Sequence, residues 1–426
     1  MRPFILLCLL AAYSLAGCVV NPVTGESEFT LMSPQQEVAI GERNYQPSQQ
    51  AQGGLYVVDP EVPAYVRRVG MALARQSHRP ELPFEFVVLN SSVPNAWAMP
   101  GGKIAINRGL LVLLEDEAQL AAVLGHEIVH VTARHAARQM TQAQLLGVGA
   151  QVLDISTRES EYGALINQGA GLGVAAWQAH YSRGNELEAD DVGMEYMSQL
   201  GYDPQGAVEL QQVFLALSKN QSTDLLSSFF ASHPPSAERV AANKAHAQSL
   251  SGSLRHRDDF QAVMKQLKKD KPAYDKQQQA ISALQQQDLN TALQLVDDAI
   301  RLQPKENSFW ETRAHIFVSQ GKAKEALRDF DQAIALNPKY FSPLLGKGSL
   351  LVASGNYAEA EKSLIASKQL LNTSIASYFL GQVKLQQGNK NEAIAYLQEA
   401  AAGGGKVGAA AREQLAKLQP AATPLN

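Results

Sequence analysis

The fold is decided by the stretch LGHEIVH at residues 124–130, which carries the pattern His-Glu-x-x-His. It lies inside an apolar, alanine-rich run, residues 117–140, that predicts a buried helix. On a helix, His126 and His130 are four residues apart, so both imidazoles leave the same face about one turn apart. This spacing lets both rings bind one tetrahedral zinc ion. Glu127, beside the first ligand, is placed to take a proton from a water on that zinc.

A second predicted helix supplies a third ligand. Two histidines leave zinc short of the three protein ligands that catalytic sites use. The segment SRGNELEAD at 182–190 begins a helix on which Glu186 and Asp190 share a face, whereas Glu188 points roughly the other way. The alternative for Glu186, taken alone, is a solvent-exposed acidic residue on a helix. Beside the histidine pair, we expect it to bind the single zinc, and Asp190 to accept the other ring N–H of a ligand histidine.

Upstream of the histidine pair, the sequence predicts a β-hairpin. Residues 83–90 read as a strand, and two further short strands flank a Pro-Gly-Gly turn within residues 95–106. The free edge of such a hairpin can pair with an extended peptide and hold its scissile amide over the metal. A purely structural hairpin is the alternative. The residues expected to bind substrate are Asn95, Ala96, Trp97 and Ala98.

Further local signals precede this hairpin. Ser33 followed by Pro34 predicts a helix start, with serine as N-cap and proline at the first helical position. The Gln/Ser/Gly-rich residues 46–54 predict a loop. Apolar residues between 60 and 76 recur with a helical period.

The N-terminus has the pattern of a signal peptide. A short apolar run follows Arg2, and Leu-Ala-Gly-Cys ends at Cys18. This resembles a bacterial lipoprotein signal, in which cleavage precedes the cysteine and the thiol receives a diacylglycerol. An ordinary signal peptide with a coincidental cysteine is the alternative. We expect a signal peptide at 1–17, a lipid anchor on Cys18 and a tether at 18–32. In enteric lipoproteins, the residue after the cysteine often decides between the inner and the outer membrane. By analogy, Val19 favours the outer membrane because it is not aspartate.

Composition limits the expected partners of the chain. Charged residues make up 18% of the 426 residues, and the formal net charge is −4. No block of lysines or arginines stands out, so nucleic acid is not an expected partner.

The C-terminal part of the chain contains an internal repeat. After a linker at 251–272, alanines recur with spacings of 34, 34 and 33 residues, which is the tetratricopeptide period. About four helical pairs over 273–417 would form an α-solenoid with a concave face, followed by a tail at 418–426. The face is either a spacer or a groove for a partner or substrate. The alanines are Ala292, Ala326, Ala360 and Ala393.

The two zinc-binding segments carry a family resemblance. HEIVH at 126–130, followed by ELEAD at 186–190, resembles the zinc metallopeptidases related to HtpX and the CaaX prenyl protease. The hairpin resembles the substrate-flanking strand of that family, and SHPP at 232–235 with Arg239 resembles its His-Pro element. The resemblance covers about half of the chain, from residue 33 to 244.

The resemblance implies an α-rich gluzincin metallopeptidase domain, here expected over 33–250, with endopeptidase activity. It also implies that His233 lies near the metal, where it either donates to the oxyanion or takes the fourth zinc position in a latent form. By itself, a histidine before two prolines predicts only a loop. The membrane-integral members have transmembrane helices that are absent here. The arrangement is closest to periplasmic members with tetratricopeptide repeats, and the lipid anchor is a departure from them.

These signals predict a mainly α protein that acts as a lipid-anchored zinc endopeptidase on the periplasmic face of a bacterial membrane. Its substrates would be misfolded or stalled envelope or outer-membrane proteins, and the repeats would recruit substrate or an envelope assembly partner. One alternative is a chaperone or scaffold with a latent zinc site, against which the intact Glu127 argues. Hydrolysis of a non-peptide substrate is another, which the hairpin edge disfavours.

Overall fold

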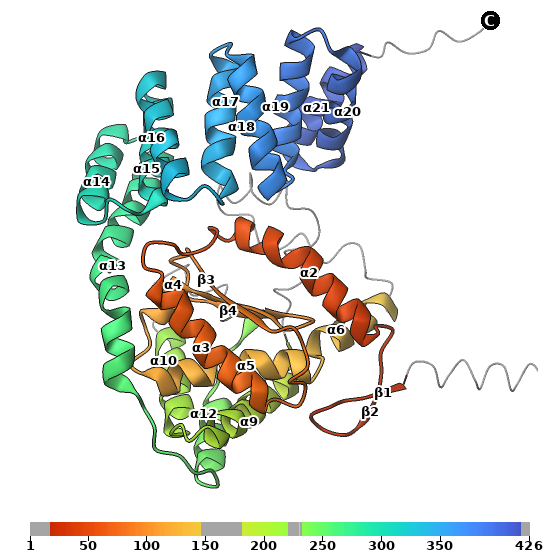
Figure 1. Cartoon of the computed structure of the whole chain (residues 1–426), viewed down its shortest axis with the longest axis vertical. Coiled ribbons are helices and arrows are strands. Elements are labelled where there is room, and N and C mark those ends of the chain that lie inside the picture. The colour runs from red at the N-terminus through yellow and green to blue at the C-terminus, as the bar shows by residue number, and fades with distance from the viewer. Residues whose placement is uncertain (1–17, 146–180, 220–229, 231, 419–426) are drawn as a thin grey trace, which may run out of the picture. The chain divides into compact units, whose positions relative to one another are not determined.

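The computed structural model describes residues 18–145, 181–219, 230 and 232–418 (Figure 1). The predicted signal peptide and the tail from residue 419 onward lie outside these residues. The chain divides into two compact units, each considered by itself. The first comprises the described residues of Met1–Tyr45, Asp59–Ser156 and Ala175–Lys265, and the second those of Gln46–Val58, Thr157–Val174 and Gln266–Asn426.

The first unit is built around α5 (Glu117–Thr132), which is buried along its whole length. Asp116 caps this helix, because its side chain accepts a hydrogen bond from the backbone N–H of Gln119. Helices α3 (Glu61–Gln76), α9 (Arg183–Gln199) and α10 (Gln205–Lys219) pack against it. The predicted run 117–140 therefore forms the central core helix only as far as Thr132. It is not one helix, because the chain turns at Arg134, with φ of 59°, and a further helix begins at His135.

Two glycines allow α5 and α9 to cross at close range. A Cβ atom on Gly193 would lie 2.9 Å from the backbone nitrogen of His126, and one on Gly125 would lie 2.9 Å from the carbonyl oxygen of Gly193. Neither distance is sterically tolerable for a real side chain. This crossing brings the histidine segment of α5 against the acidic segment of α9.

A three-stranded sheet covers α5 from another side. Its order is β3 (Glu85–Leu89), β5 (Lys103–Asn107), β4 (Ala96–Met99), so β4 is an edge strand. Strands β4 and β5 form the predicted antiparallel hairpin, and β3 runs parallel to β5. The turn contains Gly101 and Gly102, with φ of 79° and 86°, a conformation that glycine adopts without strain.

The remaining elements of the first unit are short or peripheral. The predicted tether contains a small antiparallel pair, β1 (Cys18–Val20) and β2 (Ser27–Phe29). The others are α4 (Arg108–Leu111), α6 (His135–Leu145) and α12 (Ala237–Ala247). In the described residues, no helix combines the length and hydropathy that crossing a bilayer requires.

Helix α2 (Pro34–Ala51) corrects the sequence-based prediction at its C-terminal end. The start is as expected, since the backbone N–H of Gln36 donates to Ser33 Oγ over 3.3 Å. The predicted loop at 46–54 is wrong over residues 46–51, because the helix continues through Pro47 to Ala51. Buried contacts within the second unit explain this. Gln50 accepts a hydrogen bond from the backbone N–H of Phe341 at 2.9 Å and donates to the carbonyl oxygen of Lys339 at 2.9 Å.

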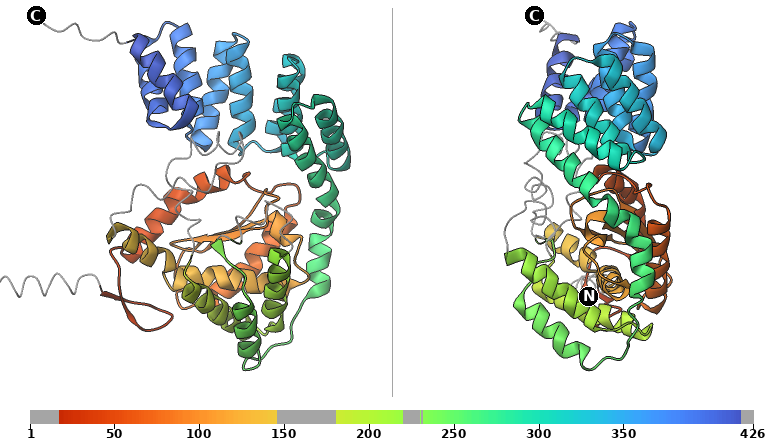
Figure 2. Two further views of the ribbon diagram at one scale, coloured as in Figure 1. Left: turned by 180° about the vertical axis from the view of Figure 1, so that it is seen from behind. Right: turned by 90° about the vertical axis from the view of Figure 1, so that its left-hand side faces the viewer.

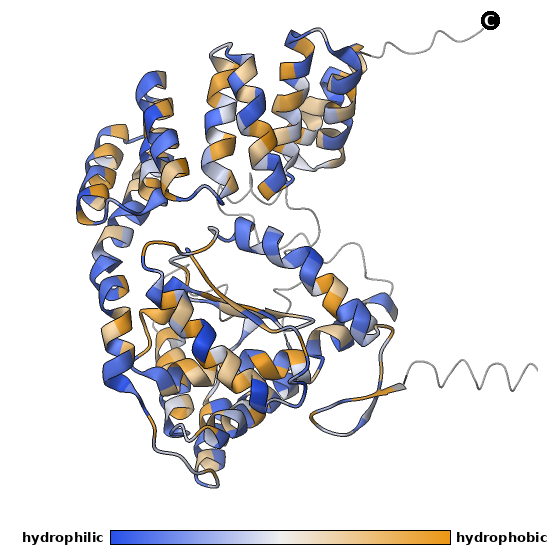
Figure 3. Cartoon of the chain, viewed as in Figure 1, coloured by the Kyte–Doolittle hydropathy of each residue, from blue (hydrophilic) through white to orange (hydrophobic). Residues whose placement is uncertain are grey.

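The second unit is the predicted solenoid of antiparallel helix pairs, so the mainly α fold class is confirmed. Successive helices lie side by side (Figure 2), and polar and apolar residues alternate along them (Figure 3). Gly348 and Gly381 face leucine side chains of the next helix at distances that leave no room for a Cβ atom. The helices are α13 (Arg257–Gln285), of which the part from Gln266 onward belongs to this unit, α14 (Leu289–Leu302), α15 (Asn307–Ser319), α16 (Ala323–Leu336), α17 (Phe341–Ala353), α18 (Tyr357–Leu370), α19 (Ser374–Gln386), α20 (Lys390–Ala402) and α21 (Gly405–Leu418).

Candidate metal centre

Four buried side chains converge where α5 crosses α9. His126, His130, Glu186 and His233 each offer one ligand atom, and these atoms all lie within 4.8 Å of one another. The Nε2 atoms of His126 and His130 are 3.0 Å apart. Carboxylate oxygens of Glu186 lie 3.5 Å from His126 Nε2 and 3.4 Å from His130 Nε2. The structure thus places the three predicted ligands together.

His233 belongs to the same group. Its Nδ1 lies 3.1 Å from Glu186 Oε1 and 3.3 Å from His126 Nε2. It precedes α12 in a segment that the sequence alone would leave as a loop. The location near the ligands is the one that the family resemblance implies for it.

The chemistry of this donor set fits a divalent cation. Imidazole nitrogens and one carboxylate are the ligands that catalytic zinc sites combine. Burial disfavours a charged His126, yet the carboxylates of Glu186 and Asp190 raise its pKa to about 10, so the site attracts positive charge. Burial acts against a charged Glu186 as well, but the neighbouring His233 and His126 hold its pKa well below the usual range.

Asp190 orients the first histidine. His126 Nδ1 donates to Asp190 Oδ1 over 2.9 Å, which leaves Nε2 to face the other ligands. Arg239 donates from Nε to Asp190 Oδ2 at 2.7 Å and from Nη2 to Oδ1 at 2.8 Å. Although burial opposes it, the Arg239 guanidinium holds the pKa of Asp190 below its ordinary value. Arg239 also lies 2.8 Å from Glu186, so one guanidinium supports two carboxylates.

A different chain of contacts supports the second histidine. His130 Nδ1 and His135 Nδ1 share a hydrogen bond of 2.7 Å, and His135 Nε2 lies 3.3 Å from Glu188 Oε2. Glu188 is not among the ligand group, but through His135 it contributes to the surroundings of the site. The ring of Tyr181 stacks on His130, with centroids 3.9 Å apart and an interplanar angle of 15°.

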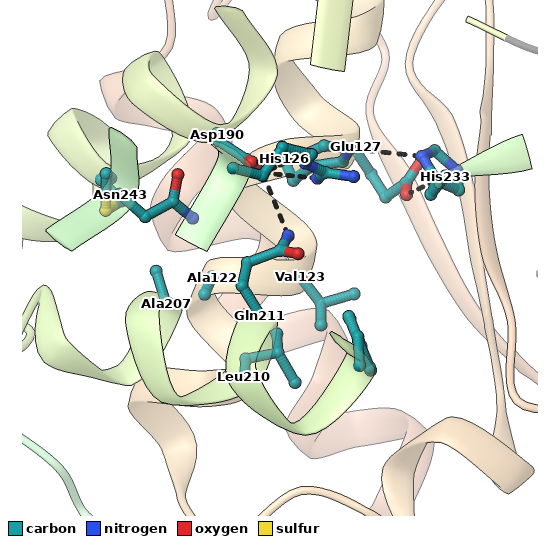
Figure 4. A pocket seen from close by; sticks show the side chains of 13 residues that line it. Ala122, Val123, His126, Glu127, Asp190, Ala207, Leu210, Gln211, His233 and Asn243 are labelled. Atoms are coloured by element: carbon teal, nitrogen blue, oxygen red, sulfur yellow. Dashed lines mark hydrogen bonds and ion pairs between the residues drawn. The ribbon is translucent and has the colours of Figure 1, made fainter. Parts of the chain in front are cut away.

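Glu127 lies next to the ligand group (Figure 4). Its side chain is buried, and Oε1 lies 3.6 Å from His233 Nε2. Among the described residues, Oε2 has no hydrogen-bond partner. Burial raises the pKa of this carboxyl group. A buried carboxylate with an open acceptor beside a cation site can accept a proton there.

Comparison with known proteins identifies the domain that holds this centre. Residues 60–247 match the model of peptidase family M48. Residues 60–247 are an M48 peptidase domain. Tetratricopeptide repeat models match 278–341, 317–369 and 345–412. The chain therefore joins an M48 domain to C-terminal tetratricopeptide repeats, as its resemblance to the HtpX-related metallopeptidases predicts.

Relatives of the M48 domain include two bacterial proteins called beta-barrel assembly-enhancing protease. The one from Yersinia pestis is 31% identical over 193 residues, covering 43% of this chain and 38% of the relative. The one from Escherichia coli K12 is 29% identical over 236 residues, covering 54% of this chain and 47% of the relative. The chain thus matches less than half the length of either relative. Among solved structures, the crystal structure of MamA is similar with a TM-score of 0.29 and 16% identity, covering 38% of this chain and 91% of MamA.

Two further predicted sites lie apart from the ligand group in the sequence. Asn95, Ala96, Trp97 and Ala98 lie at and just before the edge strand β4, the position that peptide pairing requires. All four are at least 95% buried, so a peptide needs this edge to be uncovered. Cys18 begins β1. The substrate-binding role of the former and the lipidation of the latter stay predictions.

Sequence reasoning missed several residues that surround the centre. Gln211, on α10, donates from Nε2 to Asp190 Oδ1 over 3.3 Å. Neither it nor Tyr181 has a motif, because their roles depend on which helices pack together. In the sequence, Arg239 stands out only as part of the His-Pro element, and its hydrogen bonds to Asp190 are seen only in the structure.

Proposed function

We propose that this chain is a zinc-dependent endopeptidase of the bacterial envelope, anchored by a lipid on Cys18. The observation that carries the proposal is Glu127, a buried carboxylate with an open acceptor next to a group of cation ligands. A structural metal site has no use for such a base. His126, His130 and Glu186 would hold the zinc, which when bound acts as a Lewis acid toward a carbonyl and toward water.

Glu127, Asp190 and Arg239 have different roles in the proposed reaction. Glu127 Oε2 accepts a proton from the attacking water and later passes it to the leaving amine. Asp190 holds His126 in the tautomer that presents Nε2, and Arg239 keeps Asp190 ionised.

His233 acts as a latch in this proposal. Both of the roles implied by the family resemblance place it near the metal. Its Nδ1 lies among the ligand atoms, 3.3 Å from His126 Nε2, which supports the latent form with a fourth protein ligand. Substrate entry would then require His233 to move away.

The substrates and partners follow from the relatives and the repeats. Two relatives carry the name beta-barrel assembly-enhancing protease, and we propose misfolded or stalled envelope and outer-membrane proteins as substrates here. The tetratricopeptide repeats would recruit substrate or an assembly partner through their concave face. The Leu-Ala-Gly-Cys pattern before Val19 supports a lipid anchor in the outer membrane.

The proposal is tested by metal removal. The purified protein should contain one zinc per chain and cleave an unfolded outer-membrane protein. A chelator should abolish cleavage, and added zinc should restore it. In cells, Cys18→Ser should move the protein out of the membrane fraction. Cleavage that survives complete removal of metal would contradict the enzyme proposal, and unchanged membrane association of Cys18→Ser would contradict the anchor.

A further inference from the structure

A small cavity lies beside the proposed catalytic base, where α5, α9, α10 and α12 meet (Figure 4). Glu127 and His233 form part of its lining, so the cavity adjoins the place where a scissile bond would be attacked. Most of the remaining wall is apolar. The apolar lining residues are Ala122, Val123, Met194, Ala207, Leu210 and Phe214.

Buried hydrogen-bond acceptors interrupt this apolar wall. Gln211 is 7% exposed and Asn243 is 1% exposed, and both line the cavity. The bond from Gln211 Nε2 to Asp190 fixes the orientation of the amide and leaves Oε1 as its remaining polar atom. Within the described part of the chain, Gln211 Oε1, Asn243 Oδ1 and Glu127 Oε2 have no hydrogen-bond partner.

Because no described residue donates to these atoms, a bound water or a substrate group is the donor to consider. Water can supply it in the free state. A substrate group that displaces this water must itself bring a donor, because otherwise the acceptors stay unpaired. The strongest donor of the lining, Arg239, is already engaged with Asp190, Glu186 and the carbonyl oxygen of Pro234. An acidic substrate side chain would therefore meet carboxylates and unpaired acceptors.

We propose that this cavity is a specificity pocket for the substrate residue beside the scissile bond. It selects a small side chain with an apolar stem and a hydroxyl or amide donor, such as threonine or asparagine, and rejects acidic side chains. The inference rests on the proposed endopeptidase function and adds the substrate class to it.

Paired peptides test this selectivity. The peptides differ only at the two positions that flank the scissile bond, where they carry threonine, valine or aspartate. Valine has nearly the shape of threonine but lacks the donor. We expect kcat/KM of the metal-loaded protein for threonine to exceed that for valine by about tenfold, the effect of leaving a buried acceptor unpaired. Aspartate peptides should be cleaved most slowly.

Two substitutions assign the selectivity to the pocket. Gln211→Met and Asn243→Leu replace acceptors by apolar groups of similar size, and each should bring the threonine-to-valine ratio toward one. Because both peptides are measured with the same variant, a general loss of activity leaves the threonine-to-valine ratio unchanged. Gln212→Met, at an exposed neighbour on the same helix, should keep the ratio of the unmodified protein. Metal content and thermal unfolding of each variant verify that it is folded.

The outcomes separate this inference from the function on which it rests. If cleavage requires Glu127 but the unmodified protein shows no preference for threonine, or prefers aspartate, the pocket is overturned and the endopeptidase stands. A preference that survives both substitutions also overturns the pocket. If the metal-loaded protein cleaves no peptide and no unfolded protein, the endopeptidase proposal is overturned, and the pocket with it.

Discussion

The two histidines of the predicted zinc pair are supported by different neighbours. His126 donates directly to Asp190, whereas His130 is bonded to a second histidine, His135, which in turn reaches Glu188. Hydrogen bonds from a ligand histidine to a carboxylate set its tautomer and its basicity. The direct bond should therefore contribute more to metal affinity than the indirect one.

Asp190→Asn should weaken zinc binding. An amide can no longer act as a charged acceptor for His126 and Arg239, and loss of such an outer partner typically costs 10–100-fold in affinity. Competition with a chromophoric chelator measures the dissociation constant. Asp191→Asn, at the exposed neighbouring position, should leave it unchanged. Equal affinities of Asp190→Asn and the unmodified protein would show that Asp190 does not orient His126.

His233→Ala tests the latch. If His233 holds a latent state, removing it frees a position at the centre, and cleavage of an unfolded envelope protein should increase several-fold. Zinc should remain bound, because three ligands suffice. The rate of cleavage and the metal content are measured on the same preparation. Complete loss of cleavage with zinc retained would assign His233 to catalysis instead.

At the scale of elements, the site depends on how closely α5 and α9 approach. Gly193→Ala should place a Cβ atom 2.9 Å from the backbone of His126, so the helices must move apart. We expect a loss of about 1–3 kcal/mol in the free energy of unfolding and weaker zinc binding. Gly184→Ala on the same helix meets only Ser182 Oγ at 3.8 Å and should be neutral or stabilising. Denaturant titration measures the free energy of unfolding of both variants. Equal values for Gly193→Ala and Gly184→Ala would argue against the close crossing.

The N-terminus of α5 carries a pH-dependent contribution to stability. Glu117 accepts a hydrogen bond from Tyr202 Oη at 2.6 Å and pairs with Arg68 at 2.9 Å. Burial favours the neutral acid, but these contacts hold the pKa of Glu117 below its ordinary value. A depressed carboxyl pKa stabilises the folded state above the ordinary value of about 4.3, and this stabilisation is lost as the pH falls through the lower, folded-state pKa.

Tyr202→Phe should therefore unfold at a higher pH than the unmodified protein during acid titration. At neutral pH it should lose about 1.5–3 kcal/mol, the contribution of a hydrogen bond to a charged group. Circular dichroism between pH 6 and 2 follows the transition. Tyr357→Phe, in the repeats, is the control and should leave the curve of the first unit unchanged. Superimposable acid curves for Tyr202→Phe and the unmodified protein would contradict the role given to Glu117.

At the scale of the whole molecule, two units with separate cores should respond differently to metal. We propose that zinc binds only the folded first unit, so its removal should lower the melting temperature of that unit alone. Calorimetry should show one transition that shifts with a chelator and one, from the repeats, that does not. Glu186→Gln should abolish the shift. A single transition, or equal shifts of both, would contradict this assignment.

How much of this molecule can be predicted from its sequence depends on whether the interactions involved are local or join distant segments. The spacing of His126, His130, Glu186 and Asp190 could be read from the sequence because helical geometry is local and the motifs are specific. The tetratricopeptide repeats can be predicted as well, because each helical pair has the same local sequence pattern. Gln211 and Tyr181 could not be found, because only the packing of distant helices brings them to the site. The composition of residues 46–51 predicts a loop, but contacts with residues 339 and 341 outweigh it and these residues are helical.

The most direct test of the central claim is the cleavage rate of Glu127→Gln with zinc bound. The substitution keeps the shape of the side chain and removes its capacity to accept a proton. Cleavage of an unfolded envelope protein should fall by at least 10²-fold, while zinc content and melting temperature stay the same. Glu115→Gln, an exposed change just before α5, should cleave normally. Equal cleavage by Glu127→Gln and the unmodified protein would contradict the proposed mechanism.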